Sequence, residues 1–205
     1  QWDVRRGNNA LDYPVGVSIG KTKATPLEDA VDDYLHSLRT IAPYADYVAI
    51  NVSSHNSPGL RSLQDREALT QLTTALVSTA AELNPADPLP VFVKLAPDLA
   101  PYDVGGLIAA CQDTGISGLI ATNTTTAREY LHPYDLHLAT QAGGPSVAAQ
   151  TDLPIMGVGG IMTPADAQAF FDAGASLVQI YTGFIYNGLA LVRGINTLTY
   201  PDRAR

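Results

Sequence analysis

Short runs of apolar residues alternate along the chain with longer stretches in which apolar residues recur every three or four positions. The short runs are almost entirely hydrophobic, which is typical of parallel strands that are covered on both faces. The longer stretches have the period of amphipathic helices. The pattern predicts strands over 15–19, 47–52, 91–95, 118–122, 155–158 and 177–181, and helices over 27–41, 66–83, 104–111, 164–173 and 188–198.

Strands that alternate with helices in this way form either a (β/α) barrel or an open, doubly wound sheet. Polar residues stand directly after several predicted strands, and in a barrel such positions converge on one mouth, so their placement favours the barrel. A (β/α)8 TIM barrel needs eight strands, and the pattern supplies about six of the eight βα units. At the start of the first predicted helix, Thr25-Pro26 is a capping residue followed by a proline.

Composition fits a large aliphatic interior and excludes several classes of protein. The chain has 205 residues, of which 46% are hydrophobic and 16% charged, with a formal net charge of −8. This profile rules out intrinsic disorder and a coiled coil, and the acidic balance argues against a nucleic-acid partner. A single cysteine excludes an internal disulfide and a cysteine-rich zinc site. The histidines have no metal-ligand spacing, so we expect no metal.

Two turns near the C-terminus indicate a phosphate site. Gly159 and Gly160 end one predicted strand, and Tyr181 and Thr182 end the next, 22 residues further on. Paired glycines let backbone N–H groups approach a phosphate, and barrels commonly bind phosphate between their last two βα loops. The alternative for Gly159-Gly160 alone is a tight turn.

Lys94 lies within an apolar strand, where a bare ammonium group would be costly to bury unless it meets an anion. Three roles are open for it. It could stabilise an anionic cofactor or intermediate, it could be a Schiff-base lysine with a lowered pKa, or it could be a strand-end lysine that reaches solvent.

Amide and hydroxyl side chains follow two further strands, in Asn51 to Ser57 and at Asn123-Thr124. Amides offer a donor and an acceptor in one plane, which suits planar imide or amide ligands, although such residues are also common in turns. We interpret His55 as a solvated loop residue and Cys111 as part of the core.

Together these segments resemble the dihydroorotate dehydrogenases, flavin enzymes of pyrimidine biosynthesis, and most of all their membrane-associated, quinone-reducing class. The resemblance runs from Val15 to about Gly188. It is carried by six blocks in the same order: Ile19 to Lys23, Asn51 to Gln64, Val93 to Leu99, Ala121 to Thr125, Gly157 to Gly160 and Gly174 to Thr182.

The resemblance implies an FMN enzyme that oxidises dihydroorotate to orotate and passes the electrons to a quinone. By this likeness Ser54 is the base that removes the C5 proton, Ser57 relays that proton, and Lys94 stabilises charge at the flavin. The other matched positions divide into two groups. Substrate contacts are Asn51, Asn56, Asn123 and Thr124, and cofactor contacts are Ser18, Asn51, Lys94, Thr122, Gly159, Gly160, Tyr181 and Thr182.

The chain also departs from the family pattern. Ser18 replaces an asparagine that contacts the flavin, and His55 replaces a proline. We expect one FMN-binding barrel domain over 1–205 that lacks the first two barrel strands and a segment near Gly144, as if the sequence joined pieces of a longer chain. The resemblance places the protein peripherally on the cytoplasmic side of the cell membrane, attached through a segment not present here.

Two other functions remain open at this point. One is an aldolase-type barrel that uses Lys94 as a Schiff base. The other is a non-catalytic remnant that retains only the phosphate site.

Overall fold

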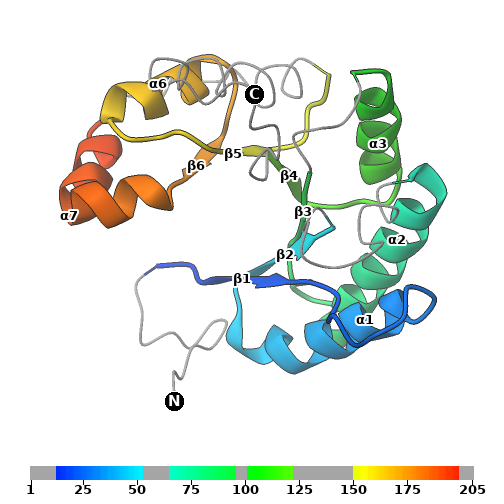
Figure 1. Cartoon of the computed structure of the whole chain (residues 1–205). Coiled ribbons are helices and arrows are strands. Elements are labelled where there is room, and N and C mark those ends of the chain that lie inside the picture. Colours follow the sequence, from blue (N-terminus) through cyan, green and yellow to red (C-terminus); the bar gives the residue numbers. More distant parts are fainter. Residues whose placement is uncertain (1–12, 53–64, 96–100, 122–149, 199–205) are drawn as a thin grey trace. The chain divides into compact units, whose positions relative to one another are not determined.

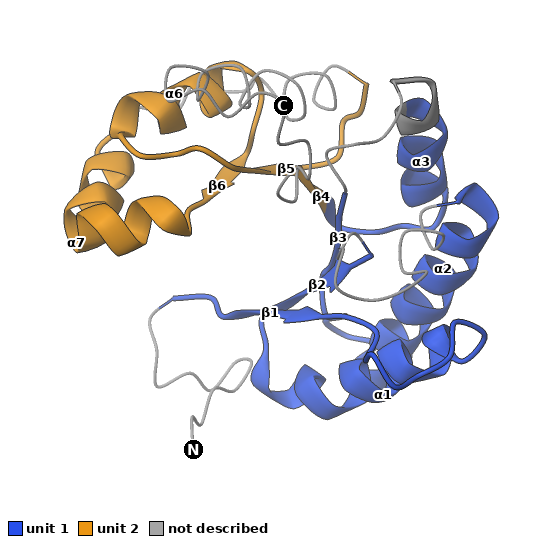
Figure 2. Ribbon diagram, in the orientation of Figure 1, with its two compact units in different colours: residues 1–95, 100–118 blue, residues 96–99, 119–205 orange. Residues whose placement is uncertain are grey.

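The computed structural model describes residues 13–52, 65–95, 101–121 and 150–198, and in 101–104 the backbone alone. The chain divides into two compact units, which are coloured separately in Figure 2. Unit 1 contains residues 1–95 and 100–118, and unit 2 contains residues 96–99 and 119–205.

Unit 1 is built on three parallel strands in the order in which they occur along the chain. In register, Ile19 faces Ile50, and Asn51 faces Lys94. At the start of the first two strands, the Val15 amide donates to the Asp46 carboxylate over 2.7 Å, and this hydrogen bond joins the two segments. The strands are β1 (Gly16–Ile19), β2 (Tyr47–Asn51) and β3 (Val91–Lys94).

Three helices pack in sequence along one side of these strands, as Figure 1 shows. Their buried positions recur at helical spacing, as Tyr34 and Leu38 do in the first and Leu69, Leu72 and Leu76 do in the second. The helices are α1 (Ala30–Ile41), α2 (Arg66–Leu83) and α3 (Pro101–Asp113), with a 3₁₀ turn η1 (Ala42–Tyr44) after α1.

The two faces of β1–β3 differ in chemistry. Alternate residues point to opposite faces, and in-register neighbours share a face. One face is fully apolar, and all of its residues except the half-buried Val17 belong to the buried core. These residues are Val17, Ile19, Val48, Ile50, Val52, Val91, Val93 and Leu95. The other face carries Ser18, Ala49, Phe92, Asn51 and Lys94. Polar side chains are therefore confined to one face of the three strands.

Unit 2 repeats the arrangement with three parallel strands and two helices. Met156 faces both Ile120 and Leu177, and Val158 faces Gln179 at the ends of neighbouring strands. The elements are β4 (Gly118–Ala121), β5 (Ile155–Val158), α6 (Pro164–Asp172), β6 (Leu177–Gln179) and α7 (Thr182–Asn196).

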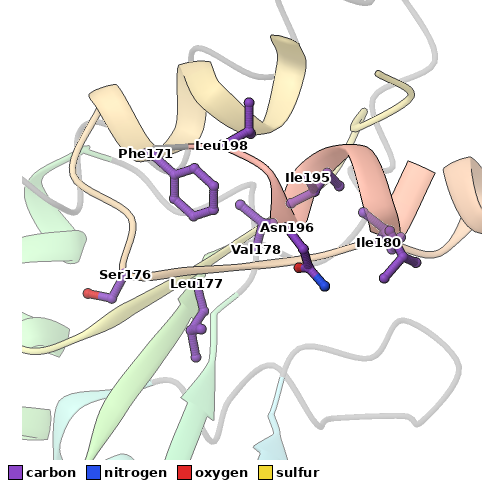
Figure 3. A pocket seen from close by; sticks show the side chains of 9 residues that line it. Phe171, Ser176, Leu177, Val178, Ile180, Ile195, Asn196 and Leu198 are labelled. Carbon is purple, nitrogen blue, oxygen red and sulfur yellow. The ribbon is translucent and has the colours of Figure 1, made fainter. Parts of the chain in front are cut away.

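The core of unit 2 lies between its two helices and β5–β6. It is formed by Ile161, Ala167, Phe170, Ala175, Leu191 and Ile195. Beside it lies a cavity of about 380 Å³, where Phe171, Val178 and Ile195 gather between α6, β6 and α7 (Figure 3). None of the predicted site residues lines this cavity.

All six predicted strands and all five predicted helices are present, whereas three helix starts, those of α1, α3 and α7, differ from the prediction. The first helix begins at Ala30 and not at Leu27, and its capping position is Asp29. Thr25 is engaged elsewhere, because its carbonyl accepts from the Lys21 ammonium. The helix predicted over 188–198 begins earlier, because α7 starts at Thr182 and is kinked at a non-helical Gly188 (φ 56°).

Smaller differences concern the ends of elements. β6 ends at Gln179, two residues earlier than predicted, because Tyr181 already caps the following helix. α3 extends three residues before and two residues beyond the predicted span 104–111. Within the described residues, no helix is long and apolar enough to cross a bilayer, and no group of acidic, histidine and cysteine side chains could hold a metal ion.

Two glycines test the packing of the units. A Cβ at Gly157 would overlap the ring of Phe170, which is itself buried in the unit 2 core, whereas a Cβ at Gly106 in α3 meets no atom within 4 Å. We expect Gly157→Ala to lower the free energy of unfolding by about 1–3 kcal/mol through overpacking. Gly106→Ala should raise it by about 0.5–1 kcal/mol, because alanine favours the helix. Urea denaturation measures both, and equal midpoints would contradict this packing.

Candidate functional site

Asn51 and Lys94 are the last residues of neighbouring strands β2 and β3, and they stand opposite each other in register. Parallel strands lie roughly 4.8 Å apart, so the two side chains leave the same face of unit 1 side by side. Ser18 lies on that face one row earlier, paired with Ala49. The structure thus brings together three of the predicted site residues.

Lys94 is half-buried, and aromatic side chains lie on the same face of the strands. Two residues before it, Phe92 shares its face and meets the ring of Tyr47 edge-on, with the ring centroids 5.4 Å apart. Burial disfavours the charged ammonium and lowers the pKa of Lys94 below its ordinary value. An anion bound at this position would remove that penalty, which makes Lys94 suited to hold a negatively charged group.

The main chain of Asn51 is held from the opposite face of the strand. The hydroxyl of Tyr34, a fully buried residue of α1, donates to the Asn51 carbonyl oxygen over 2.9 Å. The end of β2, from which the segment 53–64 continues, is therefore fixed by a helix side chain as well as by its neighbouring strand.

In unit 2 the paired glycines follow β5 directly. Gly159 and Gly160 have φ values of 122° and 67°, in the region that only glycine adopts readily. Val158 and Gln179 stand opposite each other in the sheet, so the glycine turn and the residues after β6 leave the same edge side by side. The two turns that the sequence proposed as a phosphate site thus lie side by side.

The helices that follow these turns begin differently. At the start of α6, Thr163 and Asp166 form a capping box, and the Asp166 carboxylate accepts from the amides of Met162 (3.0 Å) and Thr163 (2.8 Å). At the start of α7, Tyr181 occupies the capping position without a side-chain hydrogen bond. The first turn of α7 therefore has no side-chain cap on its backbone N–H groups, and it keeps the partial positive charge of a helix N-terminus.

Two contacts fix the start of α7 against the glycine turn. Gly183 lies so close to the Ile161 carbonyl that a Cβ there would overlap this oxygen. The Asn187 side chain donates to the Met162 carbonyl over 3.0 Å. Because both partners are backbone groups just after Gly160, the two turns form one small cradle at the edge of β5–β6.

The two clusters suit different chemistry. In unit 2 the cradle offers glycine backbone and a helix N-terminus, both of which bind anions, and it has no room for a further side chain at Gly183. In unit 1 Lys94 and Asn51 offer a cation and a hydrogen-bonding amide. Each unit thus carries one candidate cluster of its own.

The remaining predicted residues lie outside the described part of the chain. They are Ser54, Asn56, Ser57, Thr122, Asn123 and Thr124, together with His55. Cys111 is fully buried on α3, as predicted, and burial raises the pKa of its thiol to about 12. A cysteine in that environment stays protonated and serves as packing.

Three residues of the candidate site were missed by sequence reasoning. Tyr34 has the spacing of a core residue, and nothing in the pattern indicates what its hydroxyl contacts. Gly183 and Asn187 follow a strand in an apolar stretch, and their contacts with Ile161 and Met162 depend on how α7 packs. The capping box, in contrast, has a readable signature in Thr163-Pro-Ala-Asp166.

Comparison with known proteins gives one consistent family. A family model described as dihydroorotate dehydrogenase matches residues 3–198. A protein of Chloroflexus aurantiacus named dihydroorotate dehydrogenase (quinone) is 50% identical over 202 residues, covering 89% of this chain and 56% of that protein. One of Salinispora arenicola with the same name is also 50% identical, over 85% of this chain and 54% of its own length.

A solved structure leads to the same family. The ligand-free dihydroorotate dehydrogenase of Eimeria tenella is 33% identical with a TM-score of 0.76, and the match covers 89% of this chain and 57% of the other. The predicted fold class is confirmed: the six described strands belong to a (β/α)8 barrel of which this chain contains part. The chain spans about half the length of the curated relatives it matches.

The lowered pKa of Lys94 yields a test of its environment in the ligand-free protein. At pH values between the lowered pKa of Lys94 in the folded protein and its ordinary value of 10.5, the unfolded chain binds more protons at Lys94 than the folded chain does. The contribution of Lys94 to the free energy of unfolding therefore rises with pH in this range. We expect Lys94→Met to leave the melting temperature at pH 7 unchanged or higher, with the difference shrinking toward pH 10. Lys23→Met, at an exposed position, is the control. A larger loss of stability in Lys94→Met than in Lys23→Met would contradict the cost of burying the charged Lys94 ammonium.

Proposed function

This chain belongs to the dihydroorotate dehydrogenase family, and on that premise we propose that the protein oxidises dihydroorotate to orotate, with FMN as its cofactor and a quinone as electron acceptor. The observation that carries the proposal is the half-buried Lys94 beside Asn51 at neighbouring strand ends, in a chain that matches the family over residues 3–198. The partner implied is a small-molecule substrate, with no nucleic acid.

We assign the cofactor phosphate to the cradle in unit 2. Gly159, Gly160, Tyr181 and Thr182 would bind it, mainly through backbone N–H groups, as the uncapped start of α7 supports. A phosphate at this position needs no lysine or arginine, because the helix end and the glycine turn supply the positive potential.

Held by these residues, FMN would supply the hydride acceptor for the oxidation of dihydroorotate at C6 and the redox link to the quinone. Lys94 would balance the negative charge that develops during this transfer, since a preorganised cation in a partly dehydrated site costs no reorganisation as charge appears. Ser18 and Thr122 are assigned as further cofactor contacts. Asn51 would contact both cofactor and substrate.

We assign the proton transfer to Ser54, which would take the proton from C5 of the substrate. A serine is a weak base at neutral pH, so its proton must be passed on, and Ser57 is assigned that role. Asn56, Asn123 and Thr124, with Asn51, would orient the planar substrate through amide and hydroxyl groups. We further propose peripheral attachment to the cytoplasmic face of the cell membrane, because quinones are dissolved in the bilayer.

A flavin spectrum tests the proposal. We expect the intact protein to be yellow and its visible absorbance to bleach when dihydroorotate is added without oxygen, then to recover on addition of a quinone. A protein that binds FMN but does not bleach would be the non-catalytic remnant. A protein that FMN cannot reconstitute would overturn the proposal, and borohydride trapping of a carbonyl substrate on Lys94 would favour the aldolase instead.

Replacement of Ser54 tests the assignment of the base. We expect Ser54→Ala to slow flavin reduction by about 10²–10⁴-fold, the usual contribution of a general base, while the FMN content stays that of the parent. Stopped-flow absorbance measures the rate. Ser53→Ala, one residue earlier, is the matched control and should reduce at the parent rate. Equal rates in Ser54→Ala and Ser53→Ala would refute the assignment.

A further inference from the structure

Tyr34 joins the ends of two strands through a single oxygen atom. Its hydroxyl donates to the carbonyl of Asn51 at the end of β2 over 2.9 Å. The backbone N–H of Lys21, just after β1, acts on the same hydroxyl and lowers its pKa. The side chain has no exposed surface and stands on the helix-covered side of the strands. The hydroxyl thus interacts with the main chain of unit 1 at the ends of both strands.

The hydroxyl stands where the next rung of the β1–β2 ladder would be. Pairing in register ends at Ile19 and Ile50, and the same register continued by two residues would direct the Lys21 amide to the Asn51 carbonyl. The Tyr34 hydroxyl donates to this same carbonyl, just beyond the last paired residues. Tyr34 therefore supports the main chain of Asn51 where the β1–β2 pairing has ended.

The loop after β1 is held by a lysine. The Lys21 side chain is buried, and its ammonium donates to the carbonyls of Thr22 and Thr25. The main chain that follows β1 is therefore fixed next to the Tyr34 hydroxyl.

We propose that Tyr34 is a positioning residue of the dehydrogenase site, whose hydroxyl sets the orientation of the Asn51–Val52 peptide and thereby the direction of the Asn51 side chain beside Lys94. This inference rests on the proposed function, which assigns Asn51 to substrate and cofactor. The aromatic ring fills the core, and the oxygen alone carries the positioning role.

The hydroxyl is suited to a permanent role as donor. Burial, reinforced by the neighbouring Asp33 carboxylate, raises the pKa of Tyr34 to about 12 against the opposing hydrogen bond from Lys21. The group therefore keeps its proton at any pH at which the enzyme works. A phenylalanine would keep the packing and remove the hydrogen bond to the carbonyl of the half-buried Asn51.

The experiment compares Tyr34→Phe with the parent in the intact, FMN-loaded protein. We expect faster amide hydrogen exchange at Lys21 and at the end of β2, measured by peptide mass spectrometry. We expect orotate to bind roughly five- to a hundredfold more weakly, because the Asn51 side chain loses the fixed direction that the hydroxyl gives it. Flavin absorbance changes report the orotate affinity, and the FMN content should stay that of the parent.

Thr73→Val is the matched control, because it also deletes one buried hydroxyl. Thr73 lies on α2, and its hydroxyl donates to the Leu69 carbonyl within the same helix over 2.6 Å. We expect this variant to lose stability to a similar extent, while exchange at Lys21 and orotate affinity stay at the parent values. A general loss of stability would instead change hydrogen exchange at Lys21 and orotate affinity in both variants.

The outcomes separate the two proposals. A parent protein that is not reduced by dihydroorotate overturns the proposed function and the positioning role with it. A parent that is reduced, with Tyr34→Phe binding orotate as the parent does, overturns the positioning role alone. A Thr73→Val variant that weakens orotate binding as much as Tyr34→Phe also overturns the positioning role alone.

Discussion

Where helices cover one face of a parallel sheet, that face has no place for polar side chains. Each polar residue of the strands must therefore point to the other face or stand at a strand end. In unit 1 the helix-facing side of β1–β3 is entirely apolar, and all but one of its residues are buried. Asn51 and Lys94 are the polar residues that close β2 and β3 on the opposite face. The burial of the helix-facing side therefore determines where chemistry can occur, and the half-buried ammonium of Lys94 is the group on which this constraint acts most strongly.

The sequence predicted the strands well, because two-sided burial produces continuous apolar runs with few other interpretations. Helix starts were less predictable, since they depend on contacts between segments. Thr25 has the character of a capping residue, but Lys21 uses its carbonyl, and α1 begins five residues later at Ala30. The early start of α7 was missed because Thr182 to Asn187 is a short stretch followed by Gly188, a glycine with positive φ.

The candidate site shows the same division. Lys94, Asn51 and the glycines at 159 and 160 could be identified from the sequence, because their chemistry is unusual for their positions. Tyr34 could not, because a tyrosine in an apolar helix face has the pattern of any core residue, and its role depends on the register of β1 against β2. The contact of Gly183 with Ile161 depends likewise on the packing of α7, which no local pattern encodes.

The capping box of α6 makes the two helix starts in unit 2 electrostatically unequal. Asp166 places a full negative charge against the amides of Met162 and Thr163, so the positive potential of that helix end is cancelled from within the chain. The start of α7 has no such internal counter-charge from a side-chain cap. The edge of β5–β6 is thus polarised, and the phosphate proposed to bind there would be repelled from the start of α6 and attracted to the start of α7.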